Sequence, residues 1–117
     1  MKIILSLIIV VALCLVIRSQ FRIFLITSNS MIPIIKAGDV VVTMKRPPYL
    51  EGDIVTFKIH DRYITHRLIL NDGFSIQTKG DANSENDSFG TSSYEIEGKV
   101  IHILHGAQLK KNLRSMF

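Results

Sequence analysis

Residues 63–80 read YITHRLILNDGFSIQTKG, and this stretch predicts a β-hairpin. In its first half, three apolar residues and one histidine recur at every second position, so they share one face of an extended strand. They are Ile64, His66, Leu68 and Leu70. Residues 71–73, Asn-Asp-Gly, then form the turn, because Asn and Gly tolerate the positive φ that tight hairpins require. Residues 74–78 are expected to form the return strand, which ends before Gly80.

Further short apolar runs, bounded by glycine, aspartate or proline, lie on both sides of this hairpin. They are Val40–Met44, Ile54–Ile59 and residues 99–104. Within the second run, Val55, Phe57 and Ile59 alternate with polar neighbours, as in a half-buried strand. With the hairpin this makes five short strands, which predict a mostly β domain with an antiparallel sheet.

An apolar segment precedes the predicted sheet. Only Ser6 interrupts residues 3–17, and basic residues flank the segment on both sides. Fifteen helical residues would span about 22 Å, less than the roughly 30 Å of a bilayer core. However, residues 23–26 continue the apolar character and no small-x-small pattern follows, so residues 1–26 are expected to form one uncleaved signal-anchor transmembrane helix. The flanking charges nearly balance and leave the topology open.

The rest of the chain divides into a β domain, residues 27–106, and a tail, residues 107–117. The tail mixes three basic residues with Leu109, Leu113, Met116 and Phe117, so it predicts either a basic amphipathic helix on a membrane or a solvated terminus. The net charge of +4 comes from scattered residues, which argues against nucleic acid as a partner and fits proximity to membrane lipid. The single cysteine, Cys14, excludes an internal disulfide.

The candidate chemistry rests on one serine, one histidine and two aspartates. A serine hydroxyl is a poor nucleophile at neutral pH, so a hydrolase needs a proton acceptor beside it and an orienting group behind that acceptor. The sequence offers Ser30, His66, Asp81 and Asp87. Pro33 favours an extended backbone before it, which suits a serine presented on a strand edge. Individually, each of these residues is typical of a loop, a core or a turn.

Together, four motifs in a fixed order resemble signal peptidase I. They are Ser-Met-Ile-Pro at 30–33, Gly-Asp-Ile-Val at 52–55, His-Arg at 66–67, and Thr-Lys-Gly-Asp-Ala-Asn at 78–83 with Asp87 following. The resemblance is to the endoplasmic-reticulum and archaeal branch, also found in spore-forming bacteria, in which histidine replaces the lysine base of the common bacterial enzymes. It extends from the anchor to about residue 101.

The resemblance implies a role for each residue. Ser30 would attack the scissile carbonyl, His66 would take and return the proton, and Asp87 would orient His66, with Asp81 supporting the site. Ser28 matches a position that can supply an oxyanion hydroxyl, and its neighbours Asn29 and Met31 are also expected at the oxyanion and substrate-binding site. Asn29 departs from the glycine that the family commonly has there, and Ala82 from an asparagine. No cofactor and no metal is implied.

The function that follows is a membrane-bound serine endopeptidase that removes signal peptides from exported pre-proteins after small-x-small sites. The resemblance places a single-pass protein in the membrane with its catalytic domain on the export side, and leaves accessory subunits open. An extended substrate would add to the sheet edge at residues 26–29. The alternatives are a membrane-tethered, non-catalytic peptide-binding module or inactive homologue, and a lysine-based enzyme. Lys58 faces away from the apolar side of its predicted strand, which argues against the last.

Overall fold

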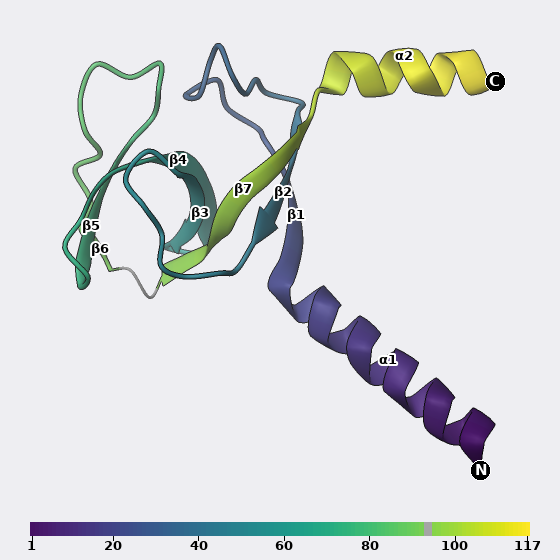
Figure 1. Ribbon diagram of the computed structural model, residues 1–117. Helices are drawn as coiled ribbons and strands as arrows, with labels where there is room; N and C mark the ends of the chain where they lie inside the picture. Colours follow the sequence, from purple (N-terminus) through teal and green to yellow (C-terminus); the bar gives the residue numbers. More distant parts are fainter. Residues whose placement is uncertain (93–94) are drawn as a thin grey trace.

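The computed structural model describes residues 1–92 and 95–117 and contains a seven-stranded antiparallel sheet, with one helix before the first strand and one after the last (Figure 1). The elements are α1 (Lys2–Gln20), β1 (Phe21–Leu25), β2 (Val40–Met44), β3 (Ile54–Ile59), β4 (Arg62–Asn71), β5 (Ser75–Lys79), β6 (Thr91–Ser92), β7 (Ile96–Leu104) and α2 (Gly106–Met116). A mostly β, antiparallel domain behind an N-terminal apolar helix is therefore confirmed. The sequence did not predict β1 or the two-residue β6.

The sheet has the order β1-β2-β7-β3-β4-β5-β6. Strands β1 and β4 stand four places apart in this order, yet Phe24 of β1 and Tyr63 of β4 stack with ring centroids 4.9 Å apart. The sheet therefore curls and brings its first strand opposite its fifth (Figure 1). This curl creates the space in which the candidate site lies.

Helix α1 ends at Gln20, whereas we expected it to continue through residue 26. From Phe21 to Leu25 the backbone pairs with β2, and this pairing satisfies the N–H and C=O groups that a longer helix would have used. The apolar character of these residues thus serves a strand. The nineteen residues of α1 span about 28 Å, close to the thickness of a bilayer core. They are all exposed, and by length and composition α1 is apolar enough to cross a membrane.

The hairpin predicted around residues 71–73 joins β4 to β5. Gly73 has a φ of +95°, and the Asp72 carboxylate accepts two backbone N–H groups that follow it. The pairing register shifts between Leu68 and Leu70, so Leu70 is 57% exposed. The predicted alternation therefore holds up to Leu68 and fails beyond it, because the bulge changes which face the later residues occupy.

A second tight turn, between β3 and β4, carries no glycine. Its two residues, His60 and Asp61, have φ values of +47° and +64°. Consecutive residues of positive φ match the twist of a hairpin, and His and Asp enter this region more readily than most side chains. The turn brings His60 to the edge of the groove described below.

Two clusters of buried side chains hold the sheet. The larger contains Tyr49, Val55, Phe57, Leu68, Ile76 and Ile96. The smaller contains Met31, Ile35 and Val41. Two of the three residues in the smaller cluster belong to the loop between β1 and β2, so this loop is anchored by its own side chains.

Candidate active site

Ser30 lies in the loop between β1 and β2, residues 26–39. Backbone hydrogen bonds of 2.8 Å close the base of this loop, and inside it the carbonyl of Met31 accepts two backbone N–H groups at 3.1 Å. We expected Ser30 on a strand edge before Pro33, but it opens a series of turns instead. The turns place the Met31 side chain in the core, and that packing fixes the serine beside it.

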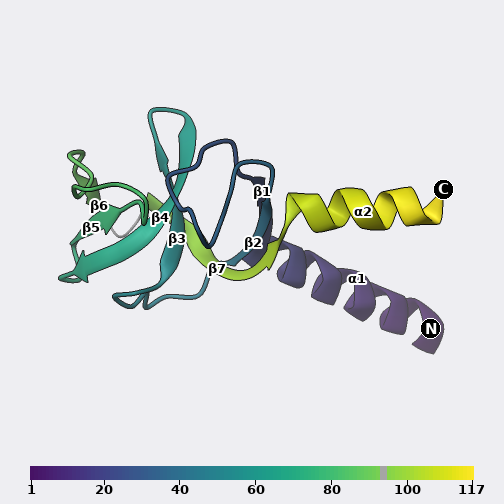
Figure 2. The ribbon, with the colours of Figure 1, turned by 90° about the horizontal axis from the view of Figure 1, so that it is seen from above.

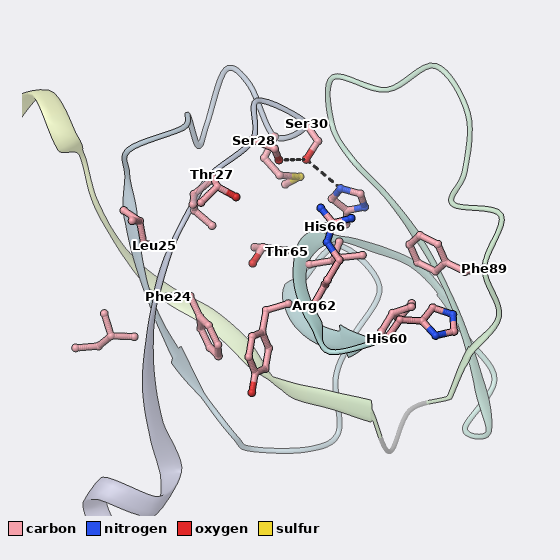
Figure 3. A pocket seen from close by; sticks show the side chains of 16 residues that line it. Phe24, Leu25, Thr27, Ser28, Ser30, His60, Arg62, Thr65, His66 and Phe89 are labelled. Carbon is pink, nitrogen blue, oxygen red and sulfur yellow. Dashed lines mark hydrogen bonds between the residues drawn. The ribbon is translucent and has the colours of Figure 1, made fainter.

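His66 contacts Ser30 from the middle of β4. Its side chain shares the inward face of the strand with Leu68, and only 8% of the residue is exposed. The Nε2 atom lies 3.0 Å from Ser30 Oγ, a contact drawn as a dashed line in Figure 3, and Nδ1 lies 2.6 Å from Asp87 Oδ2. The tautomer with hydrogen on Nδ1 donates to Asp87 and leaves Nε2 free to accept the serine proton. This is the arrangement that activates a hydroxyl nucleophile.

Asp87 is held by β5, through contacts that the sequence did not reveal. Thr78 donates its hydroxyl to Asp87 Oδ2 at 2.6 Å, and its carbonyl accepts the backbone N–H of Asp87 at 2.8 Å. The Gln77 side chain donates to the carbonyl of Asp87, also at 2.8 Å. The one feature of the sequence that pointed to these contacts is that Thr78 is the first residue of the fourth motif.

Asp81 pairs with Arg67 instead of His66. The two guanidinium contacts, from Nε and Nη2, measure 2.8 and 2.7 Å, and Arg67 also donates to the carbonyl of Gly52. The Arg67 hydrogen bonds lower the pKa of Asp81 from its usual value, although partial burial opposes this, and the Asp81 carboxylate raises the pKa of Arg67. The Arg67–Asp81 pair therefore joins the motif at 52–55, the strand of His66 and the loop after β5.

The loop after β5 packs directly on the candidate nucleophile. The backbone N–H of Ala82 donates to the carbonyl of Ser30 at 2.8 Å, so this contact does not need the family's asparagine. A Cβ atom added to Gly80 would lie 2.8 Å from the Ser30 carbonyl oxygen and 3.1 Å from its Cβ. Gly80 thus allows the close approach of two backbones, a role that its place in the fourth motif did not specify.

A groove of about 700 Å³ passes Ser30 and His66 (Figure 3). Residues 23–28 form one wall and residues between 59 and 66 form the other, with Phe89 at one end. Strand β1 is an edge strand, since it pairs with β2 alone among the described strands. A groove with both apolar and polar lining, beside a strand edge, suits an extended peptide.

The three residues expected near the oxyanion lie in different surroundings. Ser28 lines the groove, with its Oγ 3.2 Å from Ser30 Oγ. Met31 also borders the groove but is 1% exposed, and its sulfur accepts the N–H of Asp81 at 3.4 Å. The side-chain oxygen of Asn29 accepts the N–H of Ala37 and braces the loop. Of these three residues, only Ser28 presents a polar side-chain group to Ser30 Oγ.

The chain is similar to known peptidases. The model of the family described as Peptidase S24-like matches residues 7–101, which include all four candidate residues. Over 77 residues the chain is 38% identical to "Signal peptidase complex catalytic subunit sec11" of Dictyostelium discoideum, a match covering 59% of this chain and 43% of the relative. The match thus spans less than half of that relative. The chain belongs to the Peptidase S24-like family.

Proposed function

We propose that this chain is a membrane-anchored serine endopeptidase that removes signal peptides from exported pre-proteins. The observation that carries the proposal is the hydrogen-bonded series Ser30–His66–Asp87, with contacts of 3.0 and 2.6 Å, at the side of a groove lined by apolar and polar side chains. Membership of a peptidase family and likeness to a signal peptidase subunit support the substrate class.

In the proposed mechanism, Ser30 Oγ attacks the scissile carbonyl carbon while His66 Nε2 takes the hydroxyl proton. The tetrahedral oxyanion collapses, the C–N bond breaks, and His66 returns the proton to the leaving amine. A water molecule then repeats the sequence on the acyl ester, with His66 as base, and restores the Ser30 hydroxyl. Throughout, Asp87 orients the imidazole and stabilises its charged form.

Ser28 is the proposed side-chain donor to the oxyanion, together with the backbone N–H of Ser30. Its hydroxyl lies 3.2 Å from the attacking oxygen, on the groove side of the loop. Preorganised donors act most strongly where charge develops in the transition state. Ser28 can exchange its contact with Ser30 for one with the oxyanion as the new C–O bond forms.

The substrate is proposed to bind as an extended strand along β1 and the residues that follow it. Main-chain hydrogen bonds to a free edge supply affinity, and pockets for alternate side chains supply selectivity. The preference for small-x-small sites is carried over from the signal peptidase type. Because α1 leads directly into β1, the free edge begins where the anchor ends.

The proposed location is a membrane, with α1 as the single span and the sheet on the export side. An anchor next to the groove confines the enzyme and a membrane-bound substrate to the same surface, which raises their effective concentration. Accessory subunits are proposed as well, because the relative is described as the catalytic subunit of a complex.

The proposal is tested with the full chain in detergent and a pre-protein carrying a small-x-small site. Alanine variants of Ser30 and His66 should lower kcat by at least about 10³-fold. Asp87→Ala should cause a large but smaller loss, and Ser84→Ala, an exposed loop serine, serves as the control. Undiminished cleavage by Ser30→Ala would refute the mechanism. Pre-protein binding without cleavage by the wild-type chain would favour the non-catalytic binding module.

A further inference from the structure

Helix α2 has little packing of its own. It has eleven residues, of which Gly106 and Leu109 are half-buried and the others exposed. Isolated helices shorter than about 12–15 residues are marginal in water, since few residues share the cost of nucleation. An unpacked helix of this length needs a surface that stabilises it.

The two faces of α2 indicate what kind of surface that is. The apolar residues follow a helical spacing and fall on one side: Leu109, Leu113 and Met116. The basic residues are Lys110, Lys111 and Arg114, and α2 contains no acidic residue. An apolar stripe flanked by positive charge matches the boundary between acyl chains and anionic headgroups.

The direction of α2 agrees with its charge. Both helices point away from the sheet in the same general direction (Figures 1 and 2). They leave from opposite ends of the paired strands, α1 at the start of β1 and α2 at the end of β7. Since α1 is the chain's candidate membrane span, α2 extends on the side from which the membrane is reached. We propose that α2 binds the surface of an anionic bilayer as a second, interfacial contact.

The start of α2 is fixed to the loop that carries Ser30. Buried Asp39, at the end of that loop, accepts the N–H of Gly106 at 2.8 Å and lies 3.1 Å from His105 Nδ1. A Cβ atom at Gly106 would come within 2.4 Å of the carbonyl oxygen of Gly38, so the junction is close-packed. Lipid contact through α2 would thus orient the nucleophile loop over the membrane. The inference rests on the proposed function only in taking α1 as the membrane span.

The test places an environment-sensitive fluorophore on single cysteines in the full chain, in a Cys14→Ser background, reconstituted into vesicles. Labels at Leu113→Cys and Met116→Cys should shift to the blue and resist an aqueous quencher, whereas Lys111→Cys and Ser115→Cys, on the other side of the helix, should not. The shift should be clear with phosphatidylglycerol present and largely absent with phosphatidylcholine alone. Replacing Lys110 and Arg114 by glutamine should weaken it, by about fivefold in surface affinity per charge.

Equal quenching at all four positions in anionic vesicles would overturn the proposal. A blue shift that is independent of lipid charge but grows with the ratio of protein to lipid would also overturn it, in favour of a second copy of the chain. A label on the native Cys14 reports insertion of α1 separately. Pre-protein cleavage in the same vesicles reports the proposed function, so the two failures are distinguishable.

Discussion

The Thr78 hydroxyl donates a hydrogen bond to the same carboxylate oxygen of Asp87 that lies 2.6 Å from His66 Nδ1. One oxygen atom therefore receives two donors, and its position along β5 is fixed by the backbone bond between the same two residues. Thr78 is 2% exposed, so water has little access to compete for this contact. Thr78 therefore supports the orientation of His66 through Asp87, the residue to which both are hydrogen-bonded.

Thr78→Val is expected to lower kcat about tenfold, since a hydrogen bond to a charged group contributes about 1.5–3 kcal/mol and part of it is lost. KM should change less, because Thr78 does not line the groove. Steady-state cleavage of a pre-protein measures both. Thr78→Ser, which keeps the hydroxyl, should retain most of the rate; equal impairment of the two variants would mean that the methyl packing matters and the hydrogen bond does not.

The predicted strands were reliable where apolar alternation and turn residues agreed. Val40–Met44 and Ile54–Ile59 form strands with the expected bounds, and the turn at 71–73 is present. The apolar character of residues 21–25 by itself predicts a continuation of the anchor helix, whereas the partner that makes them a strand lies about twenty residues away in β2. Tertiary pairing of this kind leaves no signal inside the segment itself.

In the candidate site, too, the sequence predicts some residues, and the others become apparent only in the folded structure. The order of the motifs singled out Ser30, His66 and the two aspartates, and the geometry distinguishes the aspartates, because Asp87 contacts His66 and Asp81 contacts Arg67. The supporting contact from Thr78 depends on how two strands and a loop approach each other. Such contacts follow from the assembled fold and not from residue spacing.

Ser28→Ala is expected to lower kcat by about 10²-fold with a small change in KM, as removal of one oxyanion donor does in other hydrolases. The reason is that its hydroxyl lies beside Ser30 Oγ, 3.2 Å away, and would act mainly once negative charge has formed. Pre-steady-state cleavage measures the acylation rate directly. Ser28→Thr is the matched variant that keeps the hydroxyl. An unchanged rate in Ser28→Ala would leave the backbone N–H groups as the only donors.

Asp81→Asn is expected to reduce the free energy of unfolding by about 1–3 kcal/mol at neutral pH, because it removes a charge-assisted pair with Arg67. The pKa of Asp81 is lowered in the fold, chiefly by Arg67, so the carboxylate stabilises the protein above its unfolded pKa of about 4. This contribution disappears as the pH falls through the lower, folded pKa. Urea unfolding followed by circular dichroism in detergent gives the difference at each pH.

The control for that experiment is Asp61→Asn. The Asp61 carboxylate is 99% exposed and lies 4.0 Å from Lys58, and asparagine also accepts the positive φ of this turn. Its stability should match that of the wild type within a few tenths of a kcal/mol. A difference between wild type and Asp81→Asn that stays constant down to strongly acidic pH would contradict the role of the ion pair.

Gly80→Ala is expected to lower kcat by about 10²-fold, because the new methyl group would push the Ser30 backbone away from His66 and small displacements of reacting groups are costly. The added Cβ would lie 2.8 Å from the Ser30 carbonyl oxygen, a distance that real Cβ atoms do not show. Gly90→Ala is the matched control, since a Cβ there meets nothing within 4 Å. Cleavage rates and thermal unfolding of both variants separate misplacement from loss of fold. Wild-type cleavage by Gly80→Ala would show that Ser30 is not held by its contact with the loop after β5.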